Sequence, residues 1–159
     1  MAQRSNARRT PTDAIEMLKA DHQKVKDLFQ KYERAKDAKT QQNVADQICA
    51  ELELHAQLEE TVFYPAFEEA ADEEGEKLVE EARQEHQTVK DLMAELEEID
   101  DAEAFDRKFR ELMENVQHHV EEEEAEMFPE AEDVLEEQLE DLLQEMQELK
   151  QQLTATNKR

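Results

Sequence analysis

The stretch HAQLEETVFYP, residues 55–65, decides the fold because it occurs a second time as HVEEEEAEMFP, residues 119–129. A further stretch, DHQKVKDL at 21–28, reappears as EHQTVKDL at 85–92. Both second copies lie 64 residues after the first. This duplication predicts two copies of one helical hairpin. With short loops, the two hairpins would form an up-down-up-down antiparallel four-helix bundle with an internal pseudo-two-fold repeat.

The spacing of the apolar residues predicts four helices, each with an inward-facing stripe of residues three and four apart. We expect these helices over residues 12–36, 40–65, 76–98 and 101–128, with Thr12 or Asp13 as the first N-cap and Gly75 as the break between the hairpins. Every stripe includes a histidine, and the second and fourth also include a glutamate four residues later. These inward polar residues are His22, His55, Glu59, His86, His119 and Glu123.

The composition supports an all-α protein and limits its partners. One glycine and three prolines in 159 residues leave few turns for a sheet, and the abundant Ala, Leu, Glu, Gln, Lys and Met favour helix. The formal net charge of −25 repels phosphate backbones and anionic membranes, so we expect no nucleic-acid partner. No apolar run is long enough to span a membrane.

Three regions are predicted along the chain: a disordered N-terminal tail at 1–12, the four-helix bundle at 13–130, and a C-terminal helix at 131–159. Apolar residues in the last region step by four and three, so this helix could pack on the bundle as a fifth helix or support a homodimer. Cys49 is the only cysteine, which excludes an intrachain disulfide and fits a reducing compartment. With no visible signal peptide, we expect a cytoplasmic protein.

The inward histidines and glutamates predict a metal site. Pseudo-two-fold symmetry would bring four imidazoles and two carboxylates to one level of the bundle. Two buried carboxylates repel each other, and no Lys or Arg on the stripes could pair with them. Two metal ions would balance the charges better than one, with both glutamates bridging them and one coordination position left open. Imidazole and carboxylate suit Fe, Mn, Zn or Cu. A structural polar cluster without metal is the alternative.

The motifs DHQKVKDLF, HAQLEETVFYP, EHQTVKDLM and HHVEEEEAEMFP resemble those of the hemerythrin-like, or HHE cation-binding, family over residues 13–130. The resemblance implies a four-helix bundle around two iron ions, bridged by an oxo or hydroxo group and by carboxylates. It implies that His22 and His55 ligate one iron, that His86 and His119 ligate the other, and that Glu59 and Glu123 bridge them.

One departure from the family pattern bears on function. Oxygen-carrying hemerythrins have a further histidine four residues along the third helix, where this chain has Lys90. We therefore expect a di-iron protein that binds O2, peroxide or NO in oxygen or iron sensing or in oxidative-stress protection, rather than an oxygen carrier. Two alternatives stay open. One is an enzyme that disproportionates peroxide or oxidises ferrous iron, and the other is a helical interaction module without catalysis.

Several other residues lie close to the proposed ligands in the sequence. His118 cannot face the same way as its neighbour His119, so we expect it to be partly exposed and not a ligand. Glu60 and Glu124 repeat like the ligands, yet we favour solvent exposure over contact with a ligating imidazole. Tyr32 and Tyr64 could each supply a hydrogen bond to a bound oxygen species.

Overall fold

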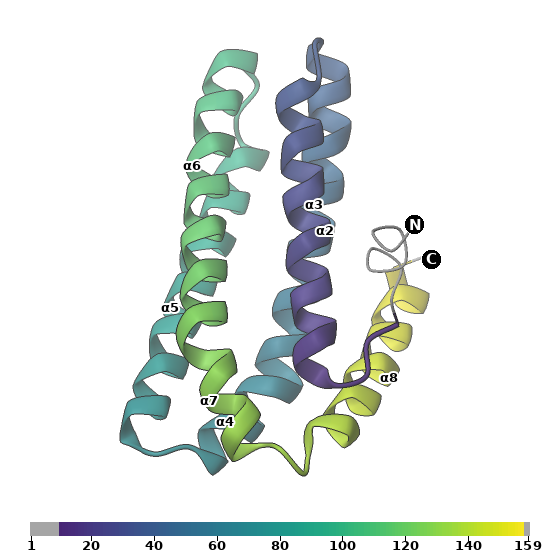
Figure 1. The fold of residues 1–159 in the computed structure, drawn as a ribbon. Helices are drawn as coiled ribbons and strands as arrows, with labels where there is room; N and C mark the ends of the chain where they lie inside the picture. The colour runs from purple at the N-terminus through teal and green to yellow at the C-terminus, as the bar shows by residue number, and fades with distance from the viewer. Residues whose placement is uncertain (1–9, 158–159) are drawn as a thin grey trace, which may run out of the picture.

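The computed structural model describes residues 10–157 of the chain, and all of its regular structure there is helical, as predicted (Figure 1). The predicted disordered tail falls mainly on residues 1–9, which lie outside the described residues. Four long helices form the bundle, two short helices follow π-helical segments, and one helix lies outside. Their bounds are α2 Ala14–Arg34, α3 Ala38–Leu58, η1 Glu59–Phe63, α4 Tyr64–Ala70, α5 Glu73–Glu97, α6 Ala102–Glu122, η2 Glu123–Met127, α7 Phe128–Val134 and α8 Leu139–Asn157.

Aspartate caps explain where the four long helices begin. The side chain of the N-cap accepts a hydrogen bond from the backbone N–H three residues later in each case, which satisfies a donor that the helix leaves free. Asp13, rather than Thr12, is the cap of α2. The other caps are Asp37 for α3, Asp72 for α5 and Asp101 for α6. Each cap contributes about 1 kcal/mol to stability.

The predicted break at Gly75 is wrong, because this residue lies inside the first turn of α5. The chain turns earlier, at Ala71, whose backbone is extended. Gly75 is buried, and a Cβ at this position would clash with the Cβ of Ala71 and lie 2.7 Å from a carboxylate oxygen of Glu130. The missing side chain therefore permits a close approach between helices and does not interrupt one.

The predicted helix ends at Pro65 and at Phe128, just before Pro129, are also wrong. The helical backbone passes through both prolines and continues in α4 and α7. A π-helical turn precedes each proline, and the N–H groups of Tyr64 and Phe128 donate to the carbonyls of Glu59 and Glu123, five residues back. A proline in a helix clashes with the carbonyl four residues earlier, and the wider turn accommodates that clash. The turn begins at each inward glutamate.

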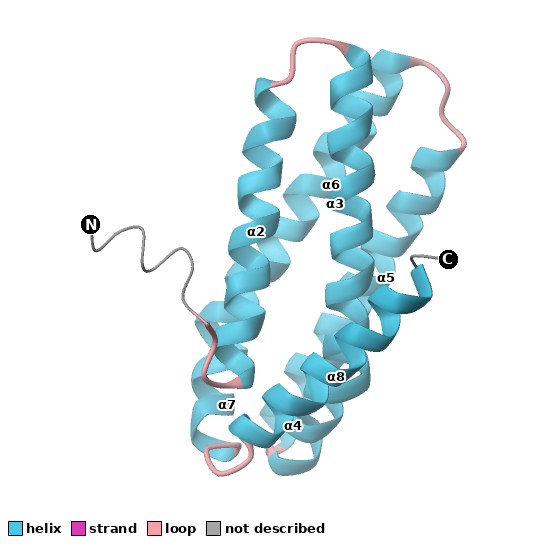
Figure 2. Cartoon of the chain, turned by 90° about the vertical axis from the view of Figure 1, so that its right-hand side faces the viewer, coloured by secondary structure: helices cyan, strands magenta, loops and turns pink. Residues whose placement is uncertain are grey.

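The core consists of two apolar clusters at either end of the bundle, with the inward polar residues between them. One cluster includes Phe29, Ile48 and Phe109, close to the α2–α3 and α5–α6 turns. The other gathers around Phe63 and Phe128 and includes α4, α7 and α8. Helix α8 folds back against α2, α3 and η1 and buries Leu139, Leu142 and Met146 (Figure 2). The predicted additional C-terminal helix thus packs on the bundle.

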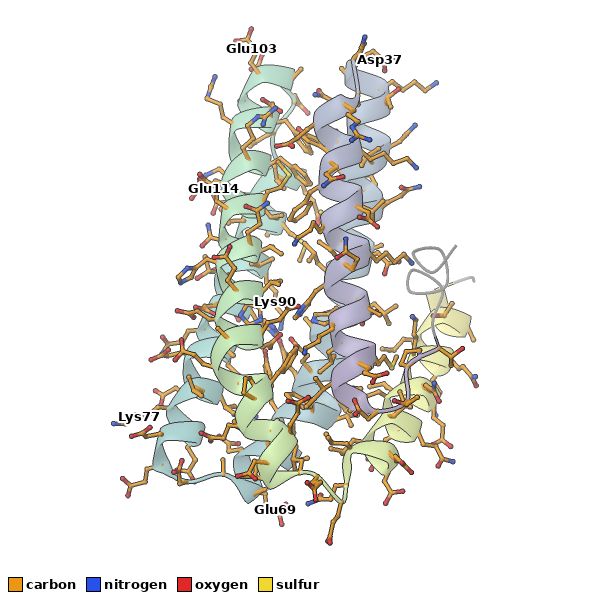
Figure 3. The ribbon with its side chains drawn as sticks, in the orientation of Figure 1. Asp37, Glu69, Lys77, Lys90, Glu103 and Glu114 are labelled. Atoms are coloured by element: carbon orange, nitrogen blue, oxygen red, sulfur yellow. The ribbon has the colours of Figure 1, made fainter. Side chains whose placement is uncertain are left out.

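The exterior is polar along the whole length of the bundle. Figure 3 labels Asp37 and Glu103 at one end and Glu69 at the other, with charged side chains projecting between them. None of the helices between residues 10 and 157 combines the length and the apolarity needed to cross a bilayer.

Candidate metal centre

The six inward polar residues come together halfway along the bundle, and all six are buried. His22 lies on α2, His55 on α3, His86 on α5 and His119 on α6, while Glu59 and Glu123 are the first residues of the two π-helical segments. Glu59 is completely buried and Glu123 is 2% exposed. Both glutamates therefore point inward, as predicted.

The donor atoms form two groups that share both carboxylates. The first donor group is His22, His55, Glu59 and Glu123, and the second is Glu59, His86, His119 and Glu123. Within each group, one donor atom per residue lies within 4.8 Å of all the others.

Each carboxylate divides its two oxygens between the groups. Glu59 places Oε2 3.3 Å from His55 Nε2 and Oε1 3.0 Å from His86 Nε2. Glu123 places Oε1 3.1 Å from His22 Nε2 and Oε2 3.4 Å from His119 Nε2. Ligand atoms bonded at about 2.1 Å to one ion are themselves about 3.0–3.4 Å apart, so these spacings suit a metal in each group.

The first donor group has no well-directed internal hydrogen bond among the described residues. Its four converging atoms, His22 Nε2, His55 Nε2, Glu59 Oε2 and Glu123 Oε1, are buried, and the His22–Glu123 and His55–Glu59 pairs are close, at 3.1 and 3.3 Å, without hydrogen-bond geometry. Buried polar atoms without partners are uncommon and costly. Four of them aimed at one point fit a cation as their common partner, and the imidazole and carboxylate chemistry suits iron.

Each imidazole is held from behind by a carboxylate at the surface. His22 Nδ1 lies 2.7 Å from Glu124, His55 Nδ1 3.0 Å from Asp21, His86 Nδ1 2.6 Å from Glu60 and His119 Nδ1 2.6 Å from Glu85. Because an ionised carboxylate only accepts, Nδ1–H is the donor in each pair. A neutral ring that donates through Nδ1 presents the lone pair of Nε2 inward, which is the form that binds metal.

These contacts correct the interpretation of Glu60 and Glu124 as merely solvated residues. Both carboxylates remain partly accessible, with side chains 30% and 40% exposed, yet each accepts a hydrogen bond from an imidazole across the hairpin boundary. Asp21 and Glu85 were missed altogether, although they repeat with the 64-residue offset directly before His22 and His86. That repetition was the signal available in the sequence.

The two tyrosines have different roles. Tyr64 Oη lies 3.0 Å from Glu59 Oε1, 2.5 Å from Glu123 Oε2 and 3.2 Å from His86 Nε2, so its hydroxyl is inside the second donor group. Tyr32 instead donates to Asp106, away from the centre. His118 is exposed at the surface as expected, where its Nε2 lies 3.1 Å from Glu122.

The buried imidazoles and carboxylates shift the pKa values of one another. Burial by itself lowers the pKa of His55, but Glu59 and Asp21 outweigh it and raise that pKa well above its ordinary value. Burial raises the pKa of Glu59, and the imidazoles of His55, His119 and His86 more than reverse this, so it lies well below its usual range. Burial together with the charges of Glu59 and Glu123 raises the pKa of Tyr64 well above its usual value.

A cavity of about 380 Å³ leads from the surface to the centre. All four ligand-candidate histidines contribute to its lining. Its exposed lining residues come from α3 and α5: Glu53, Gln57, Lys90, Ala94 and Glu97. The cavity therefore opens between these two helices and gives a small molecule access to the imidazoles.

A helical bundle with two buried donor groups of histidine and glutamate defines a candidate metal-binding protein. The chain belongs to the hemerythrin family, because the family model of the hemerythrin HHE cation-binding domain matches residues 13–131. Membership in this family implies iron binding, and the buried clusters could hold the metal.

Two curated relatives are similar over much of the chain. An uncharacterized hemerythrin-like protein of Schizosaccharomyces pombe is 36% identical over 110 residues, which are 69% of this chain and 54% of that protein. A protein of Nostoc named DNA nickase is 31% identical over 114 residues, which are 71% of this chain and 32% of that protein. The chain thus spans about half of one relative and a third of the other. No solved structure was found to match it.

Proposed function

We propose that the protein is a non-haem di-iron protein that binds O2, peroxide or NO and acts in oxygen or iron sensing or in oxidative-stress protection. The observation that carries the proposal is the division of the Glu59 and Glu123 oxygens between two donor groups, each completed by two imidazoles. Two carboxylates that each face two sites are suited to bridging a pair of ions.

Under this proposal His22 and His55 hold one iron, His86 and His119 hold the other, and both glutamates contact both. Iron would supply an exchangeable coordination position and a reversible change of oxidation state. The chain offers each ion four donor atoms, and the place of a fifth histidine is taken by Lys90, whose ammonium instead lies 3.1 Å from Glu60. The protein thus leaves room for an exogenous ligand.

The chain's own residues would prepare this position. The carboxylates behind the rings hold Nε2 toward the ions, and the apolar clusters close both ends of the centre along the bundle, so that the cavity is its route to solvent. The Tyr64 hydroxyl lies among the donor atoms, where it can donate a proton or a hydrogen bond to an oxygen-containing ligand.

Iron content of protein expressed with added iron and purified without chelators tests the proposal. We expect about two ions per chain in the wild type, about one in His22→Ala, and less than one in Glu59→Ala, which both groups share. His118→Ala is the matched control and should retain about two. Less than one iron in the wild type would contradict the proposal, as would unchanged spectra and thermal stability in the double variant His55→Ala, His119→Ala, which an interaction module predicts.

A catalytic version of this function is the second candidate, favoured by the open cavity that reaches the imidazoles. Peroxide disproportionation would release many equivalents of O2 per protein, and ferrous oxidation would consume many equivalents of Fe²⁺. A single stoichiometric spectral change would instead support ligand binding alone.

The name of the Nostoc relative does not transfer to this chain, which matches 32% of that protein. We propose that nucleic acid is not a partner, because the net charge of −25 opposes a phosphate backbone. Nicking of supercoiled plasmid by the iron-loaded protein would refute this. The division into a bundle at 13–130 and a C-terminal helix at 131–159 is also a proposal, and so is a cytoplasmic location. A homodimer through the C-terminal helix is the alternative to a fifth helix of the same chain.

A further inference from the structure

The cavity above the imidazoles is much larger than the small ligands proposed for the centre. A water molecule occupies about 30 Å³ in the liquid. The 380 Å³ of the cavity therefore corresponds to about a dozen non-hydrogen atoms, whereas O2, NO and hydrogen peroxide have two each. Its volume falls within the range of small-molecule binding pockets, about 300–1,000 Å³.

The walls of the cavity are aliphatic. Every long helix of the bundle contributes to them, and apart from the imidazoles no aromatic ring of residues 10–157 lines the space. The apolar wall residues are Val25 of α2, Leu52 of α3, Val89 and Met93 of α5, and Val116 and Val120 of α6. Walls of this kind hold water poorly, so an aliphatic molecule that displaces it gains affinity.

The mouth of the cavity selects against negative charge. Its rim carries the carboxylates of Glu53, Glu60 and Glu97 and one ammonium, Lys90, which is already paired with Glu60. A rim with three negative charges and one positive charge, on a chain with a net charge of −25, repels anions such as fatty carboxylates. The inner end is the opposite: four histidines line it, and in the metal-free protein the Nε2 atoms of His22 and His55 have no hydrogen-bond partner among the described residues.

From these features we infer that the cavity binds a neutral, unbranched aliphatic molecule of about ten non-hydrogen atoms whose polar end is a hydroperoxide or hydroxyl group. The polar end lies beside the imidazoles, and the alkyl chain extends along the valines toward the gap between α3 and α5. The choice of a hydroperoxide rests on the proposed function, whereas the size, the walls and the charge of the rim do not.

A homologous series of alcohols tests this inference without any turnover. Binding of 1-butanol through 1-dodecanol to the purified protein, measured by calorimetry, should strengthen about fourfold per added methylene and stop strengthening near 1-octanol, when the cavity is full. Octanoate, with the same chain and a negative charge, should bind at least tenfold more weakly than 1-octanol. Affinity that keeps rising through 1-dodecanol, or preference for octanoate or octylammonium, would overturn the inference.

Two variants locate the binding. Ala56→Phe and Ala94→Phe place a ring in the cavity from α3 and α5 and should each weaken 1-octanol binding at least tenfold. Ala50→Phe is the matched control, since Ala50 is an exposed alanine of α3 that does not line this cavity. Equal binding in all three would overturn the inference. The iron count of the same samples tests the proposed function separately, since alcohol binding with a length limit requires the cavity and not the metal.

Discussion

Tyr64 and Phe128 occupy the same position in the two halves of the repeat, and only Tyr64 places a hydroxyl group between the two buried glutamates. Both rings pack against a histidine: Tyr64 against His86, with ring centroids 5.3 Å apart, and Phe128 against His22, at 5.7 Å. The two donor groups are therefore alike in their ligand candidates and unlike in their surroundings. The first has unpartnered atoms, whereas the second is hydrogen-bonded by a phenol.

Replacing Tyr64 by phenylalanine tests the importance of this hydroxyl. In metal-free protein, Tyr64→Phe should lower the free energy of unfolding by roughly 1–3 kcal/mol, because two buried carboxylates lose their common donor. Urea denaturation measures the change. Tyr32→Phe is the control, since its partner Asp106 has a side chain 32% exposed and can turn to water. Equal losses in the two variants would contradict the special position of Tyr64.

Removing the charge of Glu124 tests the carboxylates behind the imidazoles. Glu124→Gln should weaken iron binding by about 10- to 100-fold, because a neutral amide orients the His22 ring less firmly and makes it a poorer ligand. Competition with a chelator of known affinity measures the change. Glu121→Gln removes the same charge from an exposed position nearby and should have little effect. If both variants hold iron equally, the contact at Nδ1 is irrelevant to binding.

Truncating Met146 tests whether α8 belongs to the bundle of its own chain. Met146 is completely buried, so Met146→Ala should lower the free energy of unfolding by about 2–5 kcal/mol. The exposed neighbour Glu145→Ala serves as the control. Urea denaturation at two protein concentrations should give the same midpoint. A midpoint that rises with concentration would show that α8 stabilises a homodimer instead.

The pH dependence of Cys49 alkylation follows from its surroundings. Burial, reinforced by the charges of Glu53, Asp46 and Glu97, raises the pKa of the Cys49 thiol to about 12. At pH 8 the fraction of Cys49 in the reactive thiolate form is thus on the order of a thousandfold smaller than that of an ordinary cysteine. Iodoacetamide should react correspondingly slowly, with a rate that rises about tenfold per pH unit up to pH 11 and becomes ordinary in urea. A rate that levels off near pH 9 in folded protein would disagree with this environment.

Periodicity and repetition in the sequence predicted the bundle and the inward direction of the polar residues. A buried stripe must recur every three or four residues, and His55 with Glu59, or His119 with Glu123, keeps that spacing. Because the helices are long and uniformly patterned, tertiary packing had little reason to override them. The metal-ligand roles of these residues are still predictions.

Predictions of helix ends and breaks from the local sequence were wrong where close packing between segments determines the structure. Helices were expected to end at residues 65 and 128, but Pro65 and Pro129 follow π-helical turns that absorb the clash, and the helical backbone continues. Gly75 was expected to break a helix, but it permits close approach to Ala71. The bonds from His86 to Glu60 and from His22 to Glu124 depend on how the hairpins pack, which the spacing within one helix does not contain.

The two hairpins differ in sequence where α8 packs on the first of them, and this difference has a physical reason. Leu58, in the first hairpin, is buried in the cluster that includes α8, whereas its counterpart Glu122 pairs with the exposed His118. The position is polar in the second hairpin, where it is open to solvent, and apolar in the first hairpin, where α8 covers it. The repeat is therefore closest around the donor residues and weakest at this outer face.

Each hairpin contributes two imidazoles, one bridging-type carboxylate and one carboxylate that reaches across to a ring on the other hairpin. Two copies of a single hairpin accordingly contain every chemical group that the centre uses. A gene half this length, whose product associated as a symmetric pair, would have been a sufficient ancestor. Joining the two copies in one chain lets them differ, so that Tyr64 supplies a phenol in one copy while Phe128 leaves a bare ring in the other.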